Sequence, residues 1–337
     1  MTRNRKIYIT IGALIALLIL VGYWLVPLRH YEGDETRIYI PKGATTDAIK
    51  DSLTSALGQE FGGEVYSMWK MLGGEESNAH GAYVVKRGDW SLRVARKVQC
   101  GRQTPVRVHI SAQRLMSGVY SRLAAKLEAD SASIAQAIDS VAREYGFKDE
   151  RWLPAAILPD TYEFYWTASP AKVATTLIGV RNDFWNDKRR AQAKAMGLSP
   201  VEVATVASIV EEESANRDEY PMIARLYLNR LGKGMKLQAD PTVKYAVGDF
   251  SIRRITGKHL SVESPYNTYK YEGLPPGPIR MTERSTIDAV LAAPQHNYLY
   301  MCAKEDFSGR HNFATTFAEH QSNARRYQQE LNRRGIR

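Results

Sequence analysis

The chain has 337 residues and a formal net charge of +10 at pH 7. Its length is ample for one or two globular domains with real cores, and neither an internal repeat nor a long low-complexity segment interrupts it. The positive charge favours an acidic partner, which can be nucleic acid, an acidic polymer or a membrane surface.

Residues 7–26 predict a single transmembrane helix. This run of about twenty residues carries no charge, is long enough to span a bilayer, and follows a basic segment over residues 1–6. A cleaved signal peptide is the competing interpretation, but the run ends with Tyr23-Trp24, aromatics suited to the lipid interface, and has no convincing cleavage site. Positive charge before the span keeps residues 1–6 in the cytoplasm, so residues 27–337 are expected outside the plasma (inner) membrane. That location argues against nucleic acid as a partner.

Residues 27–110 predict a small α+β subdomain. The alternating segment 36–40 favours a strand, and the turn after it leads into a helical stretch that begins near Thr45. A second strand is expected over 81–85 and a helix over 92–98, which gives the order strand, helix, helix, strand, helix. The end of this subdomain near residue 110 is marked by no clear linker.

Residues 111–337 predict a larger domain, preceded by a strand over 106–110. Amphipathic patterns favour helices at about 119–128, 131–145, 173–195 and 317–334. Aromatic residues gather near Asp160, and such a group is more often core than a sugar-binding cleft. Cys100 and Cys302 are expected in different domains and therefore unpaired.

The helix that begins at Ser199 has the strongest local signals. Ser199 can cap it, Pro200 occupies the first helical position, and Glu202 completes a capping box. Apolar residues then recur at helical spacing and turn one face to the core; they are Val203, Val206, Ala207 and Val210.

Three carboxylates stand at the end of this helix. At about 100° per residue, Glu212 points toward water, while Glu211 and Glu213 lie on opposite flanks of the apolar face. A carboxyl at the edge of an apolar wall has a raised pKa, which a general acid needs to keep its proton near neutral pH. The geometry does not choose between Glu211 and Glu213, and a solvated helix end is the ordinary interpretation of such a cluster.

Several sequence blocks follow one another along the chain. They are Leu158-Pro159-Asp160-Thr161-Tyr162, Ala207-Ser208-Ile209-Val210-Glu211-Glu212-Glu213-Ser214, Asn229-Arg230-Leu231, Gly234-Met235-Lys236-Leu237-Gln238-Ala239-Asp240-Pro241-Thr242-Val243, Tyr266-Asn267-Thr268-Tyr269 and Gly273-Leu274-Pro275-Pro276-Gly277-Pro278-Ile279. In this order they resemble the endolytic murein transglycosylase (YceG-like) family over nearly the whole chain. The sequence departs from the family at Leu158, where an aromatic is expected, and at Ser111-Ala112-Gln113, where a Pro-Glu-Gly turn is expected.

The resemblance implies that Glu213 is the catalytic acid. The pairs Glu213-Ser214, Leu237-Gln238 and Tyr266-Asn267 are also similar to three sites around the cleft of goose-lysozyme-like transglycosylases, which supports Glu213 over Glu211. Gln238, Tyr266 and Asn267 would then hydrogen-bond sugar rings and N-acetyl groups, since amides and phenols match neutral carbohydrate. The further candidates for substrate binding are Asp240, Thr242 and Glu211.

The resemblance also implies an α+β fold in four parts. These are a cytoplasmic tail (1–6), one transmembrane helix (7–26), a LysM-like subdomain (27–110) and a lysozyme-like catalytic domain (111–337). A LysM-like subdomain would lie along glycan chains. The plainer interpretation is that it only spaces the catalytic domain from the membrane.

The activity implied is that of a peptidoglycan lytic transglycosylase, which cuts nascent glycan strands internally between N-acetylmuramic acid and N-acetylglucosamine and ends their growth. Glu213 would protonate the leaving oxygen and then deprotonate the C6 hydroxyl of the muramic acid, which attacks C1 of its own sugar and leaves a 1,6-anhydro end. No cofactor and no metal enter this scheme, and the histidines show no ligand spacing. The expected partners are peptidoglycan strands and wall-synthesis proteins.

Two alternatives stay open. A muramidase-type hydrolase needs a second carboxylate, for which Asp240 and Asp160 are the candidates, although Asp240 stands where a turn or helix cap is also expected. A non-catalytic, wall-binding membrane scaffold is the other. A placed acid among sugar-binding pairs argues against a scaffold.

Overall fold

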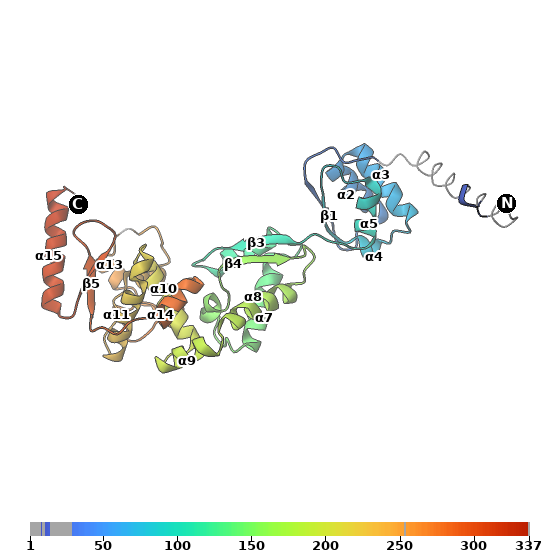
Figure 1. The fold of residues 1–337 in the computed structure, drawn as a ribbon. Helices are drawn as coiled ribbons and strands as arrows, with labels where there is room; N and C mark the ends of the chain where they lie inside the picture. Colours follow the sequence, from blue (N-terminus) through green and yellow to red (C-terminus); the bar gives the residue numbers. More distant parts are fainter. Residues whose placement is uncertain (1–7, 9–10, 14–28, 253, 336–337) are drawn as a thin grey trace. The chain divides into compact units, whose positions relative to one another are not determined.

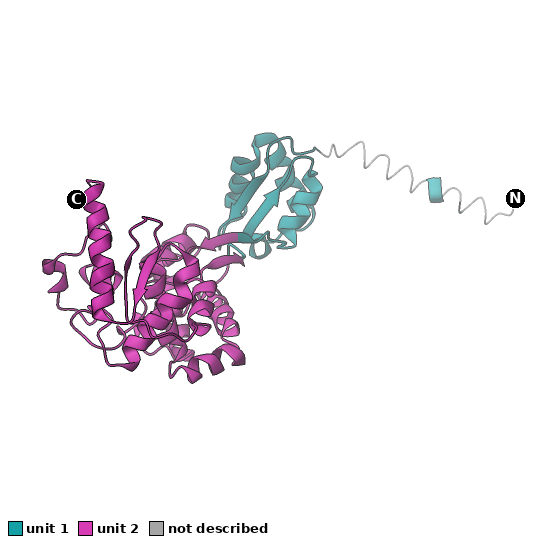
Figure 2. Cartoon of the chain, turned by 60° about the vertical axis from the view of Figure 1, so that its left-hand side comes forward, with its two compact units in different colours: residues 1–106, 164–167 teal, residues 107–163, 168–337 magenta. Residues whose placement is uncertain are grey.

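The computed structural model describes Tyr8 and residues 11–13, 29–252 and 254–335. Figure 1 follows the helices and strands along the chain, and Figure 2 colours the two compact units that they form. Unit 1 comprises Met1–Val106 with Phe164–Thr167, and unit 2 comprises Arg107–Glu163 with Ala168–Arg337. The division after Val106 falls close to the predicted boundary near residue 110. The mixture of helices and strands confirms the predicted α+β class.

The predicted membrane span over residues 7–26 falls for the most part outside the described residues. Within the described ranges, no single helix has both the length and the hydropathy to cross a membrane. One pair of helices satisfies those criteria only when taken together; it consists of α9 (Asp187–Ala195) and α10 (Pro200–Glu213), with a bend of 78° between them.

Unit 1 is a two-stranded antiparallel sheet covered by helices. Its elements are β1 (Thr36–Ile40), α2 (Thr46–Leu57), α3 (Gln59–Met71), α4 (Glu76–Ala79), β2 (Gly81–Val85) and α5 (Ser91–Gln99). The two strands pair from Thr36↔Val85 to Ile40↔Gly81. Gly62 lets α3 approach α2, because a Cβ there would overlap the carbonyl of Leu53. The predicted order of strands and main helices is confirmed, whereas the likeness to a LysM module stays a prediction.

Unit 2 is mostly helical. Its elements are β3 (Val106–Ile110), α6 (Met116–Ala124), α7 (Ser131–Glu144), a 3-10 turn (Glu150–Ala155), β4 (Asp160–Phe164), α8 (Pro170–Phe184), α9, α10, a second 3-10 turn (Arg217–Glu219), α11 (Tyr220–Gly232), α12 (Asp240–Val247), α13 (Gly257–Leu260), α14 (Arg284–Leu291), β5 (Tyr300–Ala303), β6 (His311–Ala314) and α15 (Phe317–Arg333). β3 pairs with β4, and β5 forms an antiparallel hairpin with β6. The helix predicted over 173–195 is wrong in one respect: the chain breaks after Phe184, and the side chain of Asn186 caps a new helix by accepting from the N–H of Arg189.

The helix α10 is the centre of unit 2. The predicted capping box is confirmed: the hydroxyl of Ser199 accepts from the N–H of Glu202 (3.3 Å), and the carboxylate of Glu202 accepts from the N–H of Ser199 (2.7 Å). Every residue from Val203 to Val210 is buried, because α11, α12 and α14 pack around the helix (Figure 1). Burial on all sides makes α10 a rigid support for the carboxylates at its C-terminal end.

Candidate functional site

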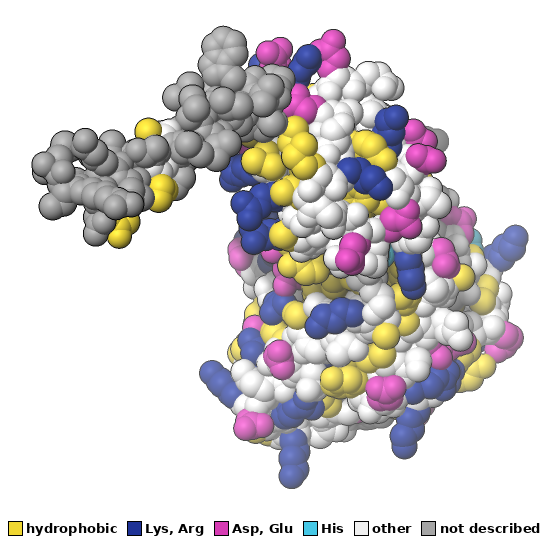
Figure 3. Space-filling view, turned by 90° about the vertical axis from the view of Figure 1, so that its right-hand side faces the viewer, with side chains coloured by type: hydrophobic (Ala, Val, Ile, Leu, Met, Phe, Trp, Pro, Cys, Tyr) yellow, Lys and Arg dark blue, Asp and Glu magenta, His cyan; other side chains and the backbone are white. Residues whose placement is uncertain are grey.

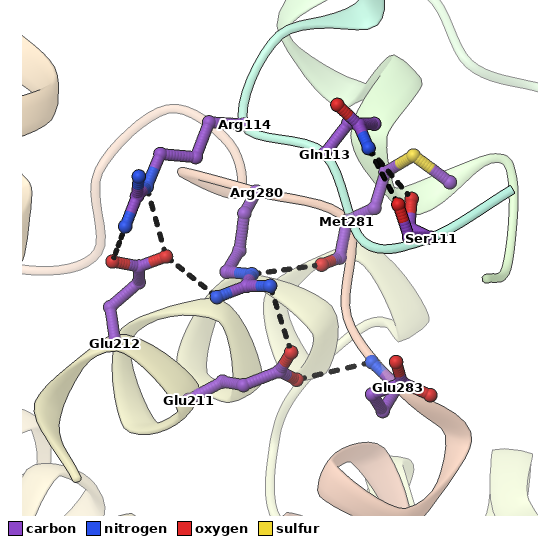
Figure 4. A network of polar contacts seen from close by, with 8 residues as sticks. All are labelled: Ser111, Gln113, Arg114, Glu211, Glu212, Arg280, Met281 and Glu283. Carbon is purple, nitrogen blue, oxygen red and sulfur yellow. Dashed lines mark hydrogen bonds and ion pairs between the residues drawn. The ribbon is translucent and has the colours of Figure 1, made fainter. Parts of the chain in front are cut away.

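The three carboxylates at the end of α10 enter two different environments. Glu211 and Glu212 face a pair of arginines (Figure 4), whereas Glu213 faces α11 and a cavity. The prediction that Glu211 and Glu213 occupy opposite flanks is consistent with this division.

Glu212 does not point freely into water, so that prediction is wrong. Only 13% of its side chain is exposed, and Arg114 holds both its oxygens, with N–O distances of 3.0 and 2.7 Å. Arg280 adds a third contact at 2.7 Å (Figure 4). Arg114 comes from the segment after β3. A hydrogen bond from the N–H of Met281 to the carbonyl of Gln113 (2.8 Å) joins this segment to the chain next to Arg280. The corner where the sequence departs from the family therefore helps to neutralise Glu212.

Glu211 has a structural environment. Its side chain is 8% exposed, lies 3.3 Å from a nitrogen of Arg280, and accepts from the N–H of Glu283 (3.1 Å), the residue that caps α14. Burial raises its pKa, and the charge of Arg280 opposes that rise. Both oxygens are occupied by protein groups, so the expected contact of Glu211 with substrate is replaced by a role in holding α14 against α10.

Glu213 lines a cavity of about 280 Å³. The other lining residues are Leu226, Tyr227, Arg230, Leu237, Gln238, Asp240, Tyr269, Met301, Cys302, Ala303 and His311. The hydroxyl of Tyr227 donates to Oε1 of Glu213 at 2.5 Å, and within the described ranges no basic side chain forms an ion pair with Glu213. Burial raises the pKa of Glu213 to about 7, the charge of Asp240 contributes in the same direction, and the Tyr227 hydrogen bond opposes it.

Asp240 and Gln238 stand on the wall of this cavity, so the structure brings two predicted residues together with Glu213. Asp240 is the first residue of α12 and accepts a hydrogen bond from the hydroxyl of Tyr269 (2.6 Å). Gln238 is exposed and has a φ of 51°, a left-handed conformation that is costly for a residue with a Cβ. A hydrogen bond from its N–H to the carbonyl of Thr268 (3.1 Å) fixes this conformation.

Thr242 and Asn267 lie in the interior, so direct contact with a substrate is not their role in this structure. Both have an exposed fraction of 0%. The Thr242 hydroxyl donates to the carbonyl of Ala239 (2.7 Å) and lies 2.8 Å from the hydroxyl of Thr268. The Asn267 amide donates to the carbonyls of Leu260 and Val262. These residues instead hold the loops that carry Gln238 and Tyr269.

Tyr266 is 9% exposed and does not line the cavity. Its ring packs against Tyr245 with a centroid distance of 4.7 Å, and burial raises its pKa. The tyrosine of the same sequence block that does reach the cavity is Tyr269, three positions later. The block does contribute a residue to the cavity wall, but that residue is Tyr269 and not Tyr266.

Two of the cavity residues that the sequence analysis did not select are Tyr227 and Arg230. Arg230 is 7% exposed and spans the cavity wall, donating to the carbonyls of Leu237 (2.7 Å) and Leu299 (2.6 Å). It belongs to the Asn229-Arg230-Leu231 block, so a signal was present. Tyr227 lay one turn earlier on the same helix, where an ordinary core tyrosine is equally expected.

The β5–β6 hairpin supplies part of the cavity lining, and His311 is its most polar contribution. The buried carboxylate of Glu219 lies 3.0 Å from Nδ1 of His311 and accepts from its backbone N–H at 2.9 Å. The sequence analysis did not predict this hairpin.

The arrangement can supply one proton near neutral pH. Burial raises the pKa of Glu213 to about 7, and hydrogen-bonding side chains such as Tyr227, Gln238 and Tyr269 line the cavity with it, together with the charged Arg230 and Asp240. Across the part of the chain that the structure describes, no three His, Cys, Asp or Glu side chains are grouped so that they could hold a metal ion.

The comparisons with known proteins agree with this picture. The sequence profile of the YceG-like family matches residues 38–326. An endolytic murein transglycosylase of Bacillus subtilis (strain 168) is 34% identical over 175 residues, which are 52% of this chain and 48% of that protein. A protein of the same name in Streptococcus pneumoniae is 31% identical over 134 residues, or 39% of this chain and 24% of its own. The matched part of the chain thus spans less than half the length of these relatives.

A solved structure extends the likeness to the fold. The crystal structure of a YceG-like protein from Listeria monocytogenes superposes with a TM-score of 0.57 at 26% sequence identity. The match covers 86% of this chain and 98% of the Listeria chain.

Proposed function

Because the chain belongs to the YceG-like family, we propose that it is a lytic transglycosylase of peptidoglycan in which Glu213 acts as both acid and base. The observation that carries this proposal is the burial of Glu213, which raises its pKa to about 7, in a cavity that offers the amide of Gln238 and the phenols of Tyr227 and Tyr269 beside the charged Arg230 and Asp240. Relatives of known name support the reaction class.

The reaction uses one carboxyl group twice. Protonated Glu213 gives its proton to the oxygen that links C1 of N-acetylmuramic acid to N-acetylglucosamine, and the C1–O bond breaks. The resulting carboxylate then takes the proton of the C6 hydroxyl, whose oxygen bonds to C1 of the same sugar. The product is a 1,6-anhydro end, no water is consumed, and Glu213 is protonated again. An intramolecular nucleophile has a high effective concentration, so a second enzyme carboxylate is unnecessary.

Tyr227 assigns the two oxygens of Glu213 to different tasks. Its hydroxyl donates to Oε1, so in the protonated acid Oε1 is the carbonyl oxygen and Oε2 carries the proton. Gln238 and Tyr269, on the same cavity wall, bind neutral sugar substituents by hydrogen bonds.

A muramidase-type hydrolase is the second candidate, because Asp240 lies in the same cavity and its charge raises the pKa of Glu213. Asp160, the other candidate for a second carboxylate, lies outside the cavity and pairs with Arg284 at 2.6 Å. The hydrogen bond from Tyr269 to Asp240 and its position at the start of α12 favour a structural role.

The cell-biological part of the proposal rests on sequence patterns. The chain is anchored in the plasma (inner) membrane by residues 7–26, with its enzymatic part outside the cytoplasm. There it cuts nascent strands internally, beside the proteins of wall synthesis, and ends their elongation. A LysM-like unit 1 lying along the glycan would be consistent with an internal cut.

The test is mass spectrometry of the sugar ends that the purified full-length chain releases from isolated peptidoglycan. Wild type, Glu213→Gln, Glu211→Gln and Asp240→Asn are compared. The expected result is anhydro ends from wild type, Glu211→Gln and Asp240→Asn, and none from Glu213→Gln. Glu211→Gln is the matched control, since it removes a neighbouring carboxylate from the same helix end.

Other outcomes separate the candidates. Reducing ends that disappear with Asp240→Asn would identify the hydrolase. A folded wild-type chain that binds glycan without cutting it would favour the non-catalytic, wall-binding scaffold. Activity that survives Glu213→Gln and vanishes with Glu211→Gln would identify Glu211 as the catalytic acid instead of Glu213.

A further inference from the structure

Unit 1 carries a basic hollow of about 780 Å³ beside α5. Its lining consists of Trp90, Leu92, Arg93, Arg96, Lys97, Arg102 and Thr104. Trp90 is 42% exposed, which is unusual for so large a ring. Figure 3 shows one face of the molecule, on which Lys and Arg side chains lie beside hydrophobic ones. We call this set of seven residues the α5 face.

The charges of the α5 face are largely unbalanced. One carboxylate, that of Asp89, pairs with Arg93 (3.3 Å) and with Lys97 (3.0 Å). Arg96 and Arg102 are exposed, and within the described ranges neither has a carboxylate at ion-pair distance. Four cations against one buried acid leave a surface that attracts anions.

The chain just before β1 is fastened to Trp90 of this face and to the two residues that flank Trp90. The N–H of Ser91 donates to the carbonyl of Arg29 (3.1 Å), and the N–H of Tyr31 donates to the carbonyl of Asp89 (2.9 Å). His30 forms a β-bridge with Trp90, and their rings meet edge to face at 4.8 Å. The predicted membrane span ends at residue 26, so at most about 14 Å of extended chain separates its end from His30.

We propose that the α5 face docks on the outer surface of the membrane, where its arginines bind the phosphates of anionic phospholipids and Trp90 enters the headgroup region. This inference rests on the proposed anchoring by residues 7–26. Basic side chains within a Debye length of an anionic leaflet are attracted to it, and tryptophan prefers the interface. Docking would hold unit 1 against the bilayer instead of leaving it on a flexible tether. It would thereby fix the distance from the membrane surface at which unit 2 begins.

Cys100 offers a reporter, because it is exposed and caps the C-terminal end of α5. The full-length chain with Cys302→Ser is labelled at Cys100 with a fluorescent donor and reconstituted into vesicles that carry an acceptor on a few lipid headgroups. One set of vesicles contains phosphatidylcholine alone, and the other also contains phosphatidylglycerol. Flotation of the vesicles is measured first, and energy transfer second.

The expected result is higher transfer in the phosphatidylglycerol vesicles, which falls to the phosphatidylcholine value in about 1 M NaCl, where the Debye length is about 3 Å. Arg96→Gln with Arg102→Gln abolishes the difference. Lys42→Gln with Lys50→Gln, two exposed cations of unit 1 outside the α5 face, preserves it.

Three outcomes would overturn the inference. Equal transfer in both vesicles, in a chain that floats with them, would refute docking while leaving the anchor intact. A chain that floats with neither would refute the anchor and docking together. A response to added peptidoglycan in phosphatidylcholine vesicles, lost with the same arginines, would assign the α5 face to the wall instead of the membrane.

Discussion

The hydroxyl of Tyr227 lies 2.5 Å from Oε1 of Glu213 and joins the last residue of α10 to the middle of α11. The two helices also pack against each other, so the carboxyl group is held by a buried partner rather than by solvent. Burial raises the pKa of both groups. Tyr227 therefore keeps its proton at every pH at which Glu213 titrates and acts only as a donor.

Tyr227→Phe should shift the pH dependence of kcat/KM. In the wild type kcat/KM is expected to fall as pH rises through about 7, because the acid would lose its proton. The Tyr227 hydrogen bond stabilises the carboxylate, so its loss raises the pKa of Glu213 by roughly one unit and moves the alkaline limb to higher pH. Tyr220→Phe, which removes another tyrosine hydroxyl from α11, should leave the limb in place. A limb that moves to lower pH in Tyr227→Phe would contradict the assigned donor.

Glu213→Gln should stabilise the protein above pH 7. The pKa of Glu213 is raised in the folded state from 4.5 to about 7, so the free energy of unfolding is unaffected below pH 4.5 and decreases as pH rises through this window. Glutamine removes that loss, and the expected gain at pH 8 is roughly 1–3 kcal/mol, with little gain at pH 4. Urea unfolding at the two pH values measures it. A gain of equal size at both pH values would show that titration is not its cause.

Local signals predicted the frame of the fold well. Ser199, Pro200 and Glu202 act within four residues, so their pattern specifies the start of α10 without any tertiary information. The break after Phe184 was not predicted, because the amphipathic pattern continues on both sides of it and Asn186 is the one local signal for a new helix. The β5–β6 hairpin escaped prediction because it has half-buried residues on both strands and no alternating pattern to reveal it.

The site was predictable only in part, because helical geometry gives the direction of a side chain but not what meets it. The wheel correctly separated Glu211 from Glu213, yet it sent Glu212 into water, where Arg114 and Arg280 in fact cover it. Those arginines are distant in sequence. Some residues of the family-like sequence blocks have a structural role instead. For example, the hydroxyl of buried Ser208 accepts from the N–H of Ile279 (3.0 Å), which joins two of these blocks. A motif identifies a region, and only the fold tells which of its side chains reach the cavity.

Arg280→Ala should destabilise unit 2 strongly. It leaves Glu211 buried without a cation, and the cost of an uncompensated buried charge is about 3 kcal/mol. Because burial raises the pKa of Glu211, part of that stability should return as pH falls and the group becomes neutral. Arg310→Ala is the matched control, since it breaks an exposed ion pair with Asp218 and should cost less than about 1 kcal/mol. Equal losses for the two variants would show that the network in Figure 4 is not a stabilising one.

Gln238 separates backbone strain from side-chain function. A φ of 51° costs glycine less conformational energy than it costs a residue with a Cβ. Gln238→Gly should therefore be more stable than Gln238→Ala by about 1 kcal/mol. At Gln192, inside α9, the order should reverse by a similar amount, because glycine weakens a helix. Both Gln238 variants lose the amide that faces the cavity, so both should raise KM for glycan to a similar extent even though their stabilities differ. Thermal unfolding and KM, measured on the same four variants, test the two effects together. If KM instead followed stability, with Gln238→Gly close to wild type, the strained backbone would serve only to close the turn, and the amide would not bind substrate.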